Sequence, residues 1–260
     1  MEQNFREKIC QASGLPPALL TVAEELPSTH EELKSLAKGG APQGTAVLAL
    51  RQTAGRGRRG RQFLSPQGGL YLSVLLRPDL PPDRLMNLTP FLAVCACDCV
   101  ESAAGLRPGV KWINDLVLNG KKLAGILTEL SLDAEGKVDY ALCSIGLNCN
   151  TAALPEELKT MATSLMAETG KETDLALLAG ALIKGFTGIL SRDAAALMAR
   201  YRADCLTLGK AVVLHTQGQE IPATALDVDE SGSLLVRLSG GEERKVSSGE
   251  VSVRGLCGYV

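Results

Sequence analysis

The segment with the strongest chemical character is a basic, glycine-rich loop at residues 52–61, QTAGRGRRGR. Its four arginines fall within six positions and repel one another, and its glycines make the segment costly to order. Such a loop gains most when a polyanion neutralises its charge, and both guanidinium groups and glycine amides suit phosphate oxygens. Composition alone leaves the alternatives open: a phosphate-binding loop, or else a solvated basic loop or a nucleic-acid-binding patch.

A second candidate segment contains two short motifs, KWIND at 111–115 and KKLAGIL at 121–127. Asn119-Gly120 lies between two apolar runs and predicts a two-residue β-hairpin. In that register Lys122 shares a sheet face with Asp115, about 7 Å away diagonally. Gly125 on the same strand lets a ligand approach the backbone closely. A lysine held there suits a carboxylate and a developing phosphate charge; the alternative is an ordinary hairpin lysine beside a surface aspartate.

The helices that position these segments are predicted from their end signals. Ser28 and Thr29 are each followed three residues later by glutamate, the capping-box pattern, and their helix is expected to end at Gly39-Gly40. A long apolar helix is expected to begin with a cap at Thr89 and to close before Gly105, with proline at its first position. Residues 155–204, which are rich in alanine and leucine, are also expected to be helical.

The predicted strands divide the chain into two parts. Short apolar runs predict strands at 45–50, 69–77 and 138–150. From about Thr207 the chain changes to alternating segments separated by Gly, Asp and Ser, which indicates a small all-β module of about 50 residues. The expected fold class is therefore α+β, with a main domain at residues 1–205 and a small β barrel at residues 206–260.

The cysteines, the net charge and the lack of a long apolar run argue against a protein with a cysteine metal site, a nucleic-acid-binding protein or a membrane-spanning protein. None of the eight cysteines forms a CxxC pair, and Cys95, Cys97 and Cys99 lie in an apolar, helix-like run where cysteine is usually a small buried hydrophobe. A net charge of −2 gives no overall attraction to nucleic acid. No apolar run reaches the roughly 18 residues that span a bilayer. No secretory signal is visible in residues 1–27, so reduced thiols and a cytoplasmic location are expected.

Taken together and in this order, GRGRRGR, KWIND and KLAGIL resemble the signature of biotin protein ligases. The resemblance covers roughly residues 25 to 256 and also includes Ser28-Thr29, GLYLS at 69–73, GLN at 146–148 and GEVSVR at 249–254. It implies a mixed sheet flanked by helices, related to class II tRNA synthetases and lipoate ligases, with a C-terminal SH3-like β barrel.

The resemblance also implies a reaction in two steps. Biotin carboxylate first attacks the α-phosphate of ATP, which gives biotinyl-5′-AMP and pyrophosphate, and the ε-amine of a carrier lysine then displaces AMP. ATP and Mg²⁺ are the implied co-substrate and metal, biotin is the substrate, and no tightly bound prosthetic group is expected. The implied partner is the biotin carboxyl carrier protein domain of acetyl-CoA carboxylase or a related carboxylase, without DNA or a membrane. A homodimer is left open.

The resemblance assigns roles to individual residues. The biotin-binding set is Ser28, Thr29, His30, Gln52, Gly55, Arg56, Gly57, Arg58, Tyr71, Lys122, Gly125 and Gly146. The ATP- or adenylate-binding set is Arg56, Arg58, Arg59, Arg61, Lys111, Trp112, Asn114, Asp115, Asn148 and Arg254. The catalytic roles fall to Lys122, Arg58 and Asp115, with Asp115 also expected to contact the magnesium of Mg-ATP.

The chain departs from the family pattern at two positions, and other functions stay open. The family usually has proline where Ile113 stands and asparagine where His30 stands. One alternative is a lipoate-type ligase on the same fold, which would need a different glycine run. Another is a phosphate- or nucleic-acid-binding module without catalysis, against which the pI near 5.8 argues. Only 27 residues precede Ser28, too few for the winged helix-turn-helix of relatives that are also repressors, so DNA binding is not expected.

Overall fold

A computed structural model describes the chain except for residues 1, 152–154, 217–218, 248–251 and 256–260. Its larger part is built on a seven-stranded sheet in the order β1-β2-β3-β7-β6-β5-β4. β1 and β2 run parallel, and the other neighbouring pairs of this sheet are antiparallel, so the sheet is mixed. Its strands are β1 (Leu20–Leu26), β2 (Ala46–Gln52), β3 (Leu70–Leu76), β4 (Gly109–Lys111), β5 (Asp115–Leu118), β6 (Lys121–Leu132) and β7 (Val138–Leu147).

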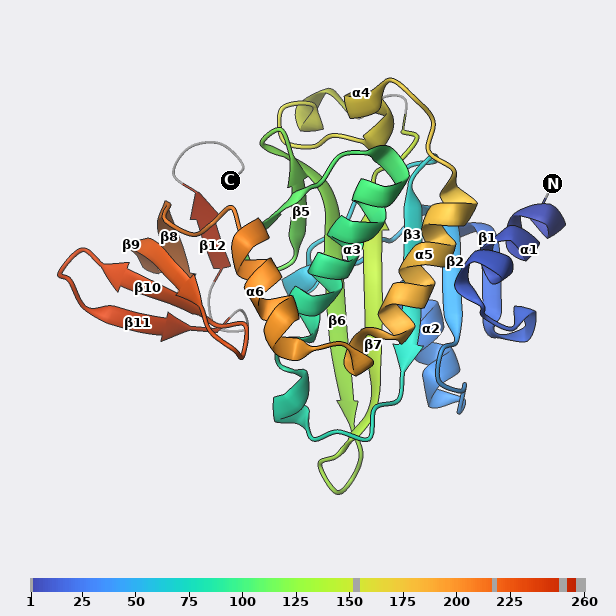
Figure 1. Cartoon of the computed structure of the whole chain (residues 1–260), viewed down its shortest axis with the longest axis horizontal. Helices are drawn as coiled ribbons and strands as arrows, with labels where there is room; N and C mark the ends of the chain where they lie inside the picture. Colours follow the sequence, from blue (N-terminus) through green and yellow to red (C-terminus); the bar gives the residue numbers. More distant parts are fainter. Residues whose placement is uncertain (1, 152–154, 217–218, 248–251, 256–260) are drawn as a thin grey trace.

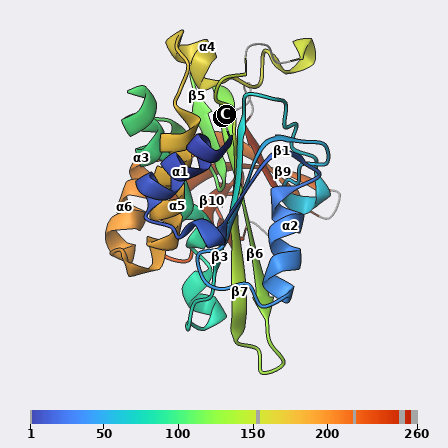
Figure 2. The ribbon, with the colours of Figure 1, turned by 90° about the vertical axis from the view of Figure 1, so that its right-hand side faces the viewer.

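Helices cover both faces of this sheet. Figure 1 shows α3, α5 and α6 in front of the strands, and Figure 2 shows α2 by itself on the opposite face. The α-helices are α1 (Glu2–Ser13), α2 (Thr29–Lys38), α3 (Leu88–Ala104), α4 (Leu165–Thr169), α5 (Leu175–Thr187) and α6 (Ala194–Asp204). Short 3-10 turns lie at Pro17–Leu19, Arg58–Gly60, Pro82–Leu85, Glu156–Leu158 and Ile189–Ser191. This arrangement confirms the expected α+β class.

The second sheet contains five antiparallel strands in the order β11-β10-β9-β8-β12. Its strands are β8 (Ala211–Thr216), β9 (Gln219–Val228), β10 (Leu234–Leu238), β11 (Glu243–Val246) and β12 (Ser252–Gly255). It lies beside α6, at the opposite end of the molecule from α1 (Figure 1). Its size and strand pattern are consistent with the small SH3-like domain that was expected.

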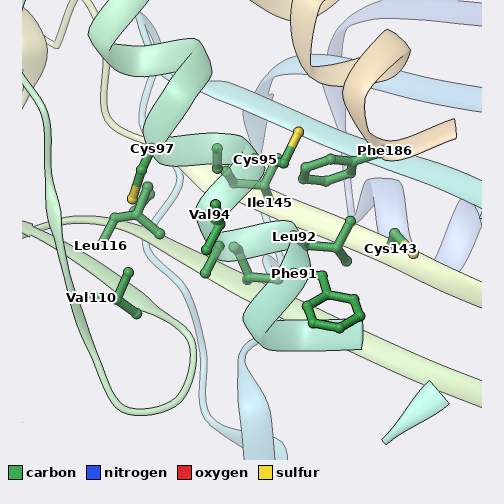
Figure 3. Packing of buried hydrophobic residues seen from close by; sticks show 14 of the residues in the cluster. Phe91, Leu92, Val94, Cys95, Cys97, Val110, Leu116, Cys143, Ile145 and Phe186 are labelled. Carbon is green, nitrogen blue, oxygen red and sulfur yellow. The ribbon is translucent and has the colours of Figure 1, made fainter. Parts of the chain in front are cut away.

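The apolar helix α3 is the centre of the main core. Phe91, Leu92 and Val94 pack with Ile145 of β7 and Phe186 of α5 (Figure 3). The segment Pro82–Ala104 meets the length and composition of a membrane span, but 67% of its apolar window is buried inside the protein. Burial of this kind is what a core helix shows.

The sequence predicted that Cys95, Cys97 and Cys99 of α3 are buried hydrophobes, and the structure confirms this for Cys95 and Cys97. Cys95 and Cys97 are buried in the core cluster (Figure 3). Cys99 is half-buried. The seven cysteines that the structure describes are all free thiols. Burial raises the pKa of the Cys97, Cys143 and Cys149 thiols well above the ordinary value.

The helix ends test the capping predictions. Ser28 is the N-cap of α2, its Oγ accepts the Glu31 amide, and the helix ends at Lys38 with Gly39 as C-cap, as predicted. The start predicted for α3 was wrong by two residues, because Asn87 is the N-cap and Thr89 lies inside the helix. The Thr89 hydroxyl instead lies 2.6 Å from that of Thr128 on β6.

The helical run expected at residues 155–204 is divided by three new caps. Ser164, Asp174 and Asp193 each accept backbone amides at the start of α4, α5 and α6. A side-chain acceptor before each apolar stretch satisfies amides that have no partner within the helix, and so permits separate short helices.

Candidate active site

The hairpin predicted from Asn119-Gly120 is present. Both residues have positive φ angles, 48° and 74°, which is the backbone twist that a two-residue hairpin turn requires. Val117 pairs with Lys122 in the predicted register. The turn therefore fixes which face of β6 carries the Lys122 side chain.

A register shift in this hairpin brings the predicted catalytic residues together. The shift lies between Leu116 and Val117, and it places Asp115 directly opposite Gly125. The Lys122 ammonium is 2.7 Å from Asp115 Oδ1. A Cβ on Gly125 would lie 3.4 Å from both Asp115 Oδ1 and the Lys122 side chain, so glycine keeps the space beside this ion pair open.

The basic loop folds back on itself as a small hairpin. Arg56 pairs with Gln62, and the Gly57 amide donates to the Arg61 carbonyl at 2.8 Å. Arg59, at the turn, has a φ of 58°. The two ends of the loop therefore lie close together where the loop joins the rest of the protein.

Arg58 is the loop arginine that points into the site. Its Nη1 donates to Asn114 Oδ1 at 3.2 Å. Burial lowers the pKa of the Arg58 guanidinium below its ordinary value, while nearby Asp115 acts in the opposite direction. An arginine stays charged under any ordinary condition, so Arg58 and Lys122 place two cations around one carboxylate.

The other arginines of the loop lie at its exposed rim. Arg56 makes an ion pair of 3.2 Å with Glu31, and both side chains are about half exposed, at 55% and 45%. Arg59 and Arg61 are exposed as well. An exposed pair of this kind contributes little to stability, so these side chains can exchange partners at small cost.

Phe63 forms one wall of the site and was missed in the sequence. Gly125 and Gly146 are paired across β6 and β7, and a Cβ on Gly146 would come within 2.6 Å of the Phe63 ring. The Lys122 ammonium lies 5.5 Å from the centre of the same ring, within cation–π range. The only available signal was its position, since Phe63 is the first large apolar residue after the arginine loop.

Tyr71 closes the apolar side of this wall. It pairs with Gly146 across β3 and β7, and its ring meets that of Phe63 edge to face at 6.4 Å. The Tyr71 hydroxyl donates to the Pro66 carbonyl at 2.8 Å, and burial raises its pKa above the ordinary value. The predicted glycines and Tyr71 thus lie together under the Phe63 ring.

A polar cluster adjoins this wall at the start of α2. Gln52 Oε1 accepts the Thr29 amide at 2.8 Å and lies 3.2 Å from the Thr29 hydroxyl, while Gln52 Nε2 donates to Ser65 Oγ at 2.9 Å. A Cβ on Gly55 would be 2.4 Å from the Phe63 carbonyl and 2.5 Å from Ser65 Oγ, so only glycine fits there. The structure therefore brings Thr29, Gln52 and Gly55 together, as predicted.

His30 does not occupy the expected position. It is 4% exposed, and its two ring nitrogens contact Ser144 and Glu129, which lie on β7 and β6. The structure gives this side chain no contact with Gln52 or with the glycine wall, so a direct contact from His30 to a ligand is not supported.

The KWIND segment is held from several sides. Asn114 Nδ2 donates to the Ile126 carbonyl at 2.9 Å, and Lys111 pairs with Asp115 across β4 and β5. Trp112 is almost fully buried, and its indole Nε1 donates to the Gly232 carbonyl of the C-terminal sheet at 3.0 Å. Ile113, where the family usually has proline, is joined to Trp112 by a cis peptide bond.

Two other predicted nucleotide contacts are Asn148 and Arg254. Asn148 is buried, and its side-chain amide donates to the Thr163 carbonyl at 2.9 Å, which supports the segment before α4. Arg254 belongs to β12, where it pairs with Val213, but its side chain lies outside the described residues.

The geometry suits a ligand with an apolar body and an anionic end. The glycine and aromatic wall would take the body, the Gln52 cluster offers hydrogen-bond donors and acceptors at one side, and Lys122 and Arg58 lie where an anion would be held. Cations already fixed in a half-buried site can stabilise charge that develops during a reaction without moving.

Comparisons with known proteins agree with this geometry. The sequence pattern of the biotin/lipoate A/B protein ligase family matches residues 22–148, and that of the biotin protein ligase C terminal domain matches residues 207–254. A biotin--[acetyl-CoA-carboxylase] ligase of Mycobacterium tuberculosis is 33% identical, over 96% of this chain and 94% of its own length. A bifunctional ligase/repressor of Bacillus spizizenii is 33% identical over 90% of this chain and 74% of its own length.

A solved structure shows the same architecture. The biotin protein ligase of Aquifex aeolicus, determined in complex with biotin and ATP, superposes with a TM-score of 0.77 at 31% identity. The match covers 91% of this chain and 98% of the Aquifex chain. The similarity therefore extends over both sheets rather than over a single motif.

Proposed function

The chain belongs to the biotin/lipoate A/B protein ligase family, and on this basis we propose that it converts biotin and ATP to biotinyl-5′-AMP and then biotinylates a carrier protein. The observation that carries the proposal is the convergence of Lys122, Arg58 and Asp115 beside the paired glycines Gly125 and Gly146. It places two cations next to the wall formed by these glycines and the Phe63 ring. The fold is that of an Aquifex relative that binds biotin and ATP.

In the first step, a biotin carboxylate oxygen attacks the α-phosphorus of ATP, and the bond to the β-phosphate oxygen breaks to release pyrophosphate. Two anions must approach each other, so their repulsion is a large part of the barrier. Lys122 would lie by the carboxylate and Arg58 over the phosphate, where both cations lower that repulsion. The ion pair with Asp115 holds the lysine ammonium in position.

In the second step, the neutral ε-amine of a carrier lysine attacks the acyl carbon of the mixed anhydride. The bond to AMP breaks, AMP leaves with the electron pair, and the amine nitrogen gives up a proton. The same cations would stabilise the negative charge on the departing phosphate. The relatives named as acetyl-CoA-carboxylase ligases support a carboxylase biotin carrier as the acceptor.

The biotin head group would bind at the start of α2. Thr29 and Gln52 offer the donors and acceptors that a flat ureido ring needs, with Ser28 and Gly55 beside them. Tyr71, Gly125, Gly146 and Phe63 would shape the pocket for the rest of the molecule. Arg56 and Gly57 would lie over the carboxylate.

The nucleotide would lie along the KWIND segment. We assign Asn114, Trp112, Lys111, Arg59 and Arg61 to it, and we retain Asn148 and Arg254 as further contacts. Among the residues that the structure describes, no three His, Cys, Asp or Glu side chains are placed to hold a metal ion. Magnesium is commonly bound by one or two carboxylates together with substrate phosphates, so Asp115 fits as the protein ligand of Mg-ATP.

The remaining assignments follow from the family. We divide the chain into a catalytic domain at 1–205 and a C-terminal domain at 206–260; the two family matches, at 22–148 and 207–254, fall on either side of this boundary. We place the enzyme in the cytoplasm, where its free thiols would stay reduced.

Exchange of radioactive pyrophosphate into ATP tests the proposal. Exchange should require biotin and Mg²⁺ and should need no carrier protein, because adenylation is complete before the carrier enters. Lipoate in place of biotin is the control for the related ligase, and a mixture without any acid measures the background. Equal exchange with lipoate would contradict the biotin assignment, and no exchange with either acid would contradict the ligase.

A further inference from the structure

His30 is the buried end of a chain of side-chain hydrogen bonds that leads to Gln52. His30 Nδ1 lies 2.9 Å from Ser144 Oγ, and that hydroxyl lies 2.8 Å from Ser73 Oγ. Ser73 Oγ lies 3.0 Å from Thr29 Oγ1, which in turn lies 3.2 Å from Gln52 Oε1. Each link is a hydroxyl that can both donate and accept, so the hydrogens of the whole chain must point in a consistent direction.

The other ring nitrogen of His30 has its hydrogen fixed by Glu129. His30 Nε2 lies 3.1 Å from Glu129 Oε2, and Lys34 Nζ lies 2.6 Å from Glu129 Oε1. Burial alone raises the pKa of Glu129, but the hydrogen bonds from Lys34 and His30 outweigh it and leave the pKa below the ordinary value. An ionised carboxylate only accepts hydrogen bonds, so Nε2 carries a hydrogen whether the ring is charged or neutral.

The charge of the imidazole ring therefore decides whether Nδ1 donates or accepts the hydrogen bond with Ser144. A charged imidazolium donates from Nδ1 to Ser144, and the hydroxyls then donate in sequence until Thr29 donates to Gln52 Oε1. A neutral ring accepts at Nδ1, and the same hydroxyls reverse, so that Thr29 donates to Ser73 instead. In the charged state Gln52 Oε1 accepts both the amide and the hydroxyl of Thr29; in the neutral state it accepts the amide alone.

We propose that His30 is a positioning residue for the biotin head group. Its charge decides whether the second hydrogen-bond acceptor site on Gln52 Oε1 is free for biotin or occupied by the Thr29 hydroxyl. The inference rests on the proposed function, in which the ureido N–H groups of biotin meet this cluster. With His30 neutral, a ureido N–H can bond to the open site on Gln52. With His30 charged, the Thr29 hydroxyl occupies that site, and biotin loses one hydrogen bond.

The charged and titratable groups near His30 are few in the described part of the chain. Glu129 of β6 contacts the ring directly, and Lys34 of α2 pairs with Glu129. Glu31 of α2 and Tyr140 of β7 act on Lys34. Ser73 on β3 is neutral. Glu31 is engaged by Arg56 at 3.2 Å. Histidine side chains in general titrate between about pH 5 and 8, so the test covers this range.

The test is the dissociation constant of biotin, measured by titration calorimetry without ATP between about pH 5.5 and 8.5. Affinity should rise with pH by about three- to tenfold, the contribution of one hydrogen bond. Binding should also release a fraction of a proton, which is detected as a dependence of the measured heat on the buffer. The thermal melting temperature of every variant checks that it is folded.

Three variants separate the hydrogen-bond chain from other causes. His30→Asn should bind biotin without this pH response. Glu129→Gln should also remove it, because a carboxamide can donate to Nε2, and the neutral ring then keeps its hydrogen on Nδ1. This second variant alters a half-exposed side chain and decides the question if His30→Asn does not fold. Lys34→Gln is the matched control, and it should keep the response because the carboxylate remains.

The outcomes are distinct. Affinity that is constant or rises toward acid, or a pH response that both His30→Asn and Glu129→Gln retain, overturns the inference and leaves the proposed function intact. If the unaltered protein binds no biotin at any pH, both the proposed function and this inference fail.

Discussion

Two unlike partners hold the Lys122 ammonium in place. Asp115 Oδ1 lies 2.7 Å from it, and the Phe63 ring centre lies 5.5 Å from it. The carboxylate supplies an opposite charge, and the ring supplies a wall that keeps water away from one side. A cation held in this way loses little freedom when a substrate carboxylate arrives, since its position is already set.

Lys122→Ala should therefore lower the rate of biotin-dependent pyrophosphate exchange by roughly 30- to 1000-fold, because a charge-assisted contact in a half-buried site is lost. Lys121→Ala, one residue earlier and on the other face of β6, is the matched control and should change the rate little. A loss below about threefold for Lys122→Ala would remove the lysine from the proposed mechanism.

The residues that sequence analysis placed correctly are those fixed by local pattern. Lys122 and Asp115 follow from a hairpin turn only a few residues away. His30 was misplaced because its partners Ser144 and Glu129 are 114 and 99 residues away in the chain. Phe63 was missed for the same reason, since the glycines beneath it lie on β6 and β7 and nothing near Phe63 indicates them.

The arginine loop is the element that we expect to move during the reaction. Arg58 reaches Asn114, while the loop's remaining arginines lie at the exposed rim. An acyl-adenylate left open to water would hydrolyse or acylate any nearby amine, so the loop is expected to close tightly over it. The exposed arginine side chains, which now contact water, would then contact phosphate oxygens.

Arg58→Gly should weaken retention of biotinyl-AMP and increase biotinylation of a bystander protein added to the reaction. Trypsin should cut the loop in the free enzyme and spare it when biotinyl-AMP is bound. Arg51→Ala is the control, since Arg51 is an exposed arginine just before the loop that pairs with Glu25. Equal cleavage with and without the adenylate would argue against closure.

At the scale of elements, the start of a helix was predicted correctly where the capping side chain has no other hydrogen-bond partner. Ser28 caps α2 as predicted, but Thr89 does not cap α3 because its hydroxyl meets Thr128 on a strand far along the chain. The register shift beside Leu116 was also beyond the sequence, because alternation by itself predicts an unbroken ladder.

At the scale of the whole molecule, one turn of the C-terminal sheet touches the site. The Gly232 carbonyl accepts the Trp112 indole, and the Glu230 carbonyl accepts Asn87 Nδ2 at 3.0 Å. Arg202 of α6 also donates to the Val228 carbonyl and pairs with Glu230. The two sheets are therefore joined through the KWIND segment that would bind the nucleotide.

Trp112→Phe should raise KM for ATP roughly three- to 30-fold while leaving biotin binding without ATP unchanged. The ring is kept, but the buried Gly232 carbonyl loses its donor, which costs about 1–3 kcal/mol. Steady-state exchange kinetics measure the effect. Asn87→Ala is the matched control, because it breaks a second contact of the same turn that lies outside the KWIND segment. A KM for ATP equal in both variants would show that the indole contact only supports the fold.

The buried thiols have a consequence for a protein that makes a reactive acylating agent. A mixed anhydride reacts readily with thiolates, and a self-acylated enzyme would waste its product. Of the cysteines described, all but Cys99 are buried, and burial keeps Cys97, Cys143 and Cys149 as protonated, poorly nucleophilic thiols. Burial therefore removes Cys97, Cys143 and Cys149 from competition with the carrier amine, which favours acylation of nitrogen over acylation of these thiols.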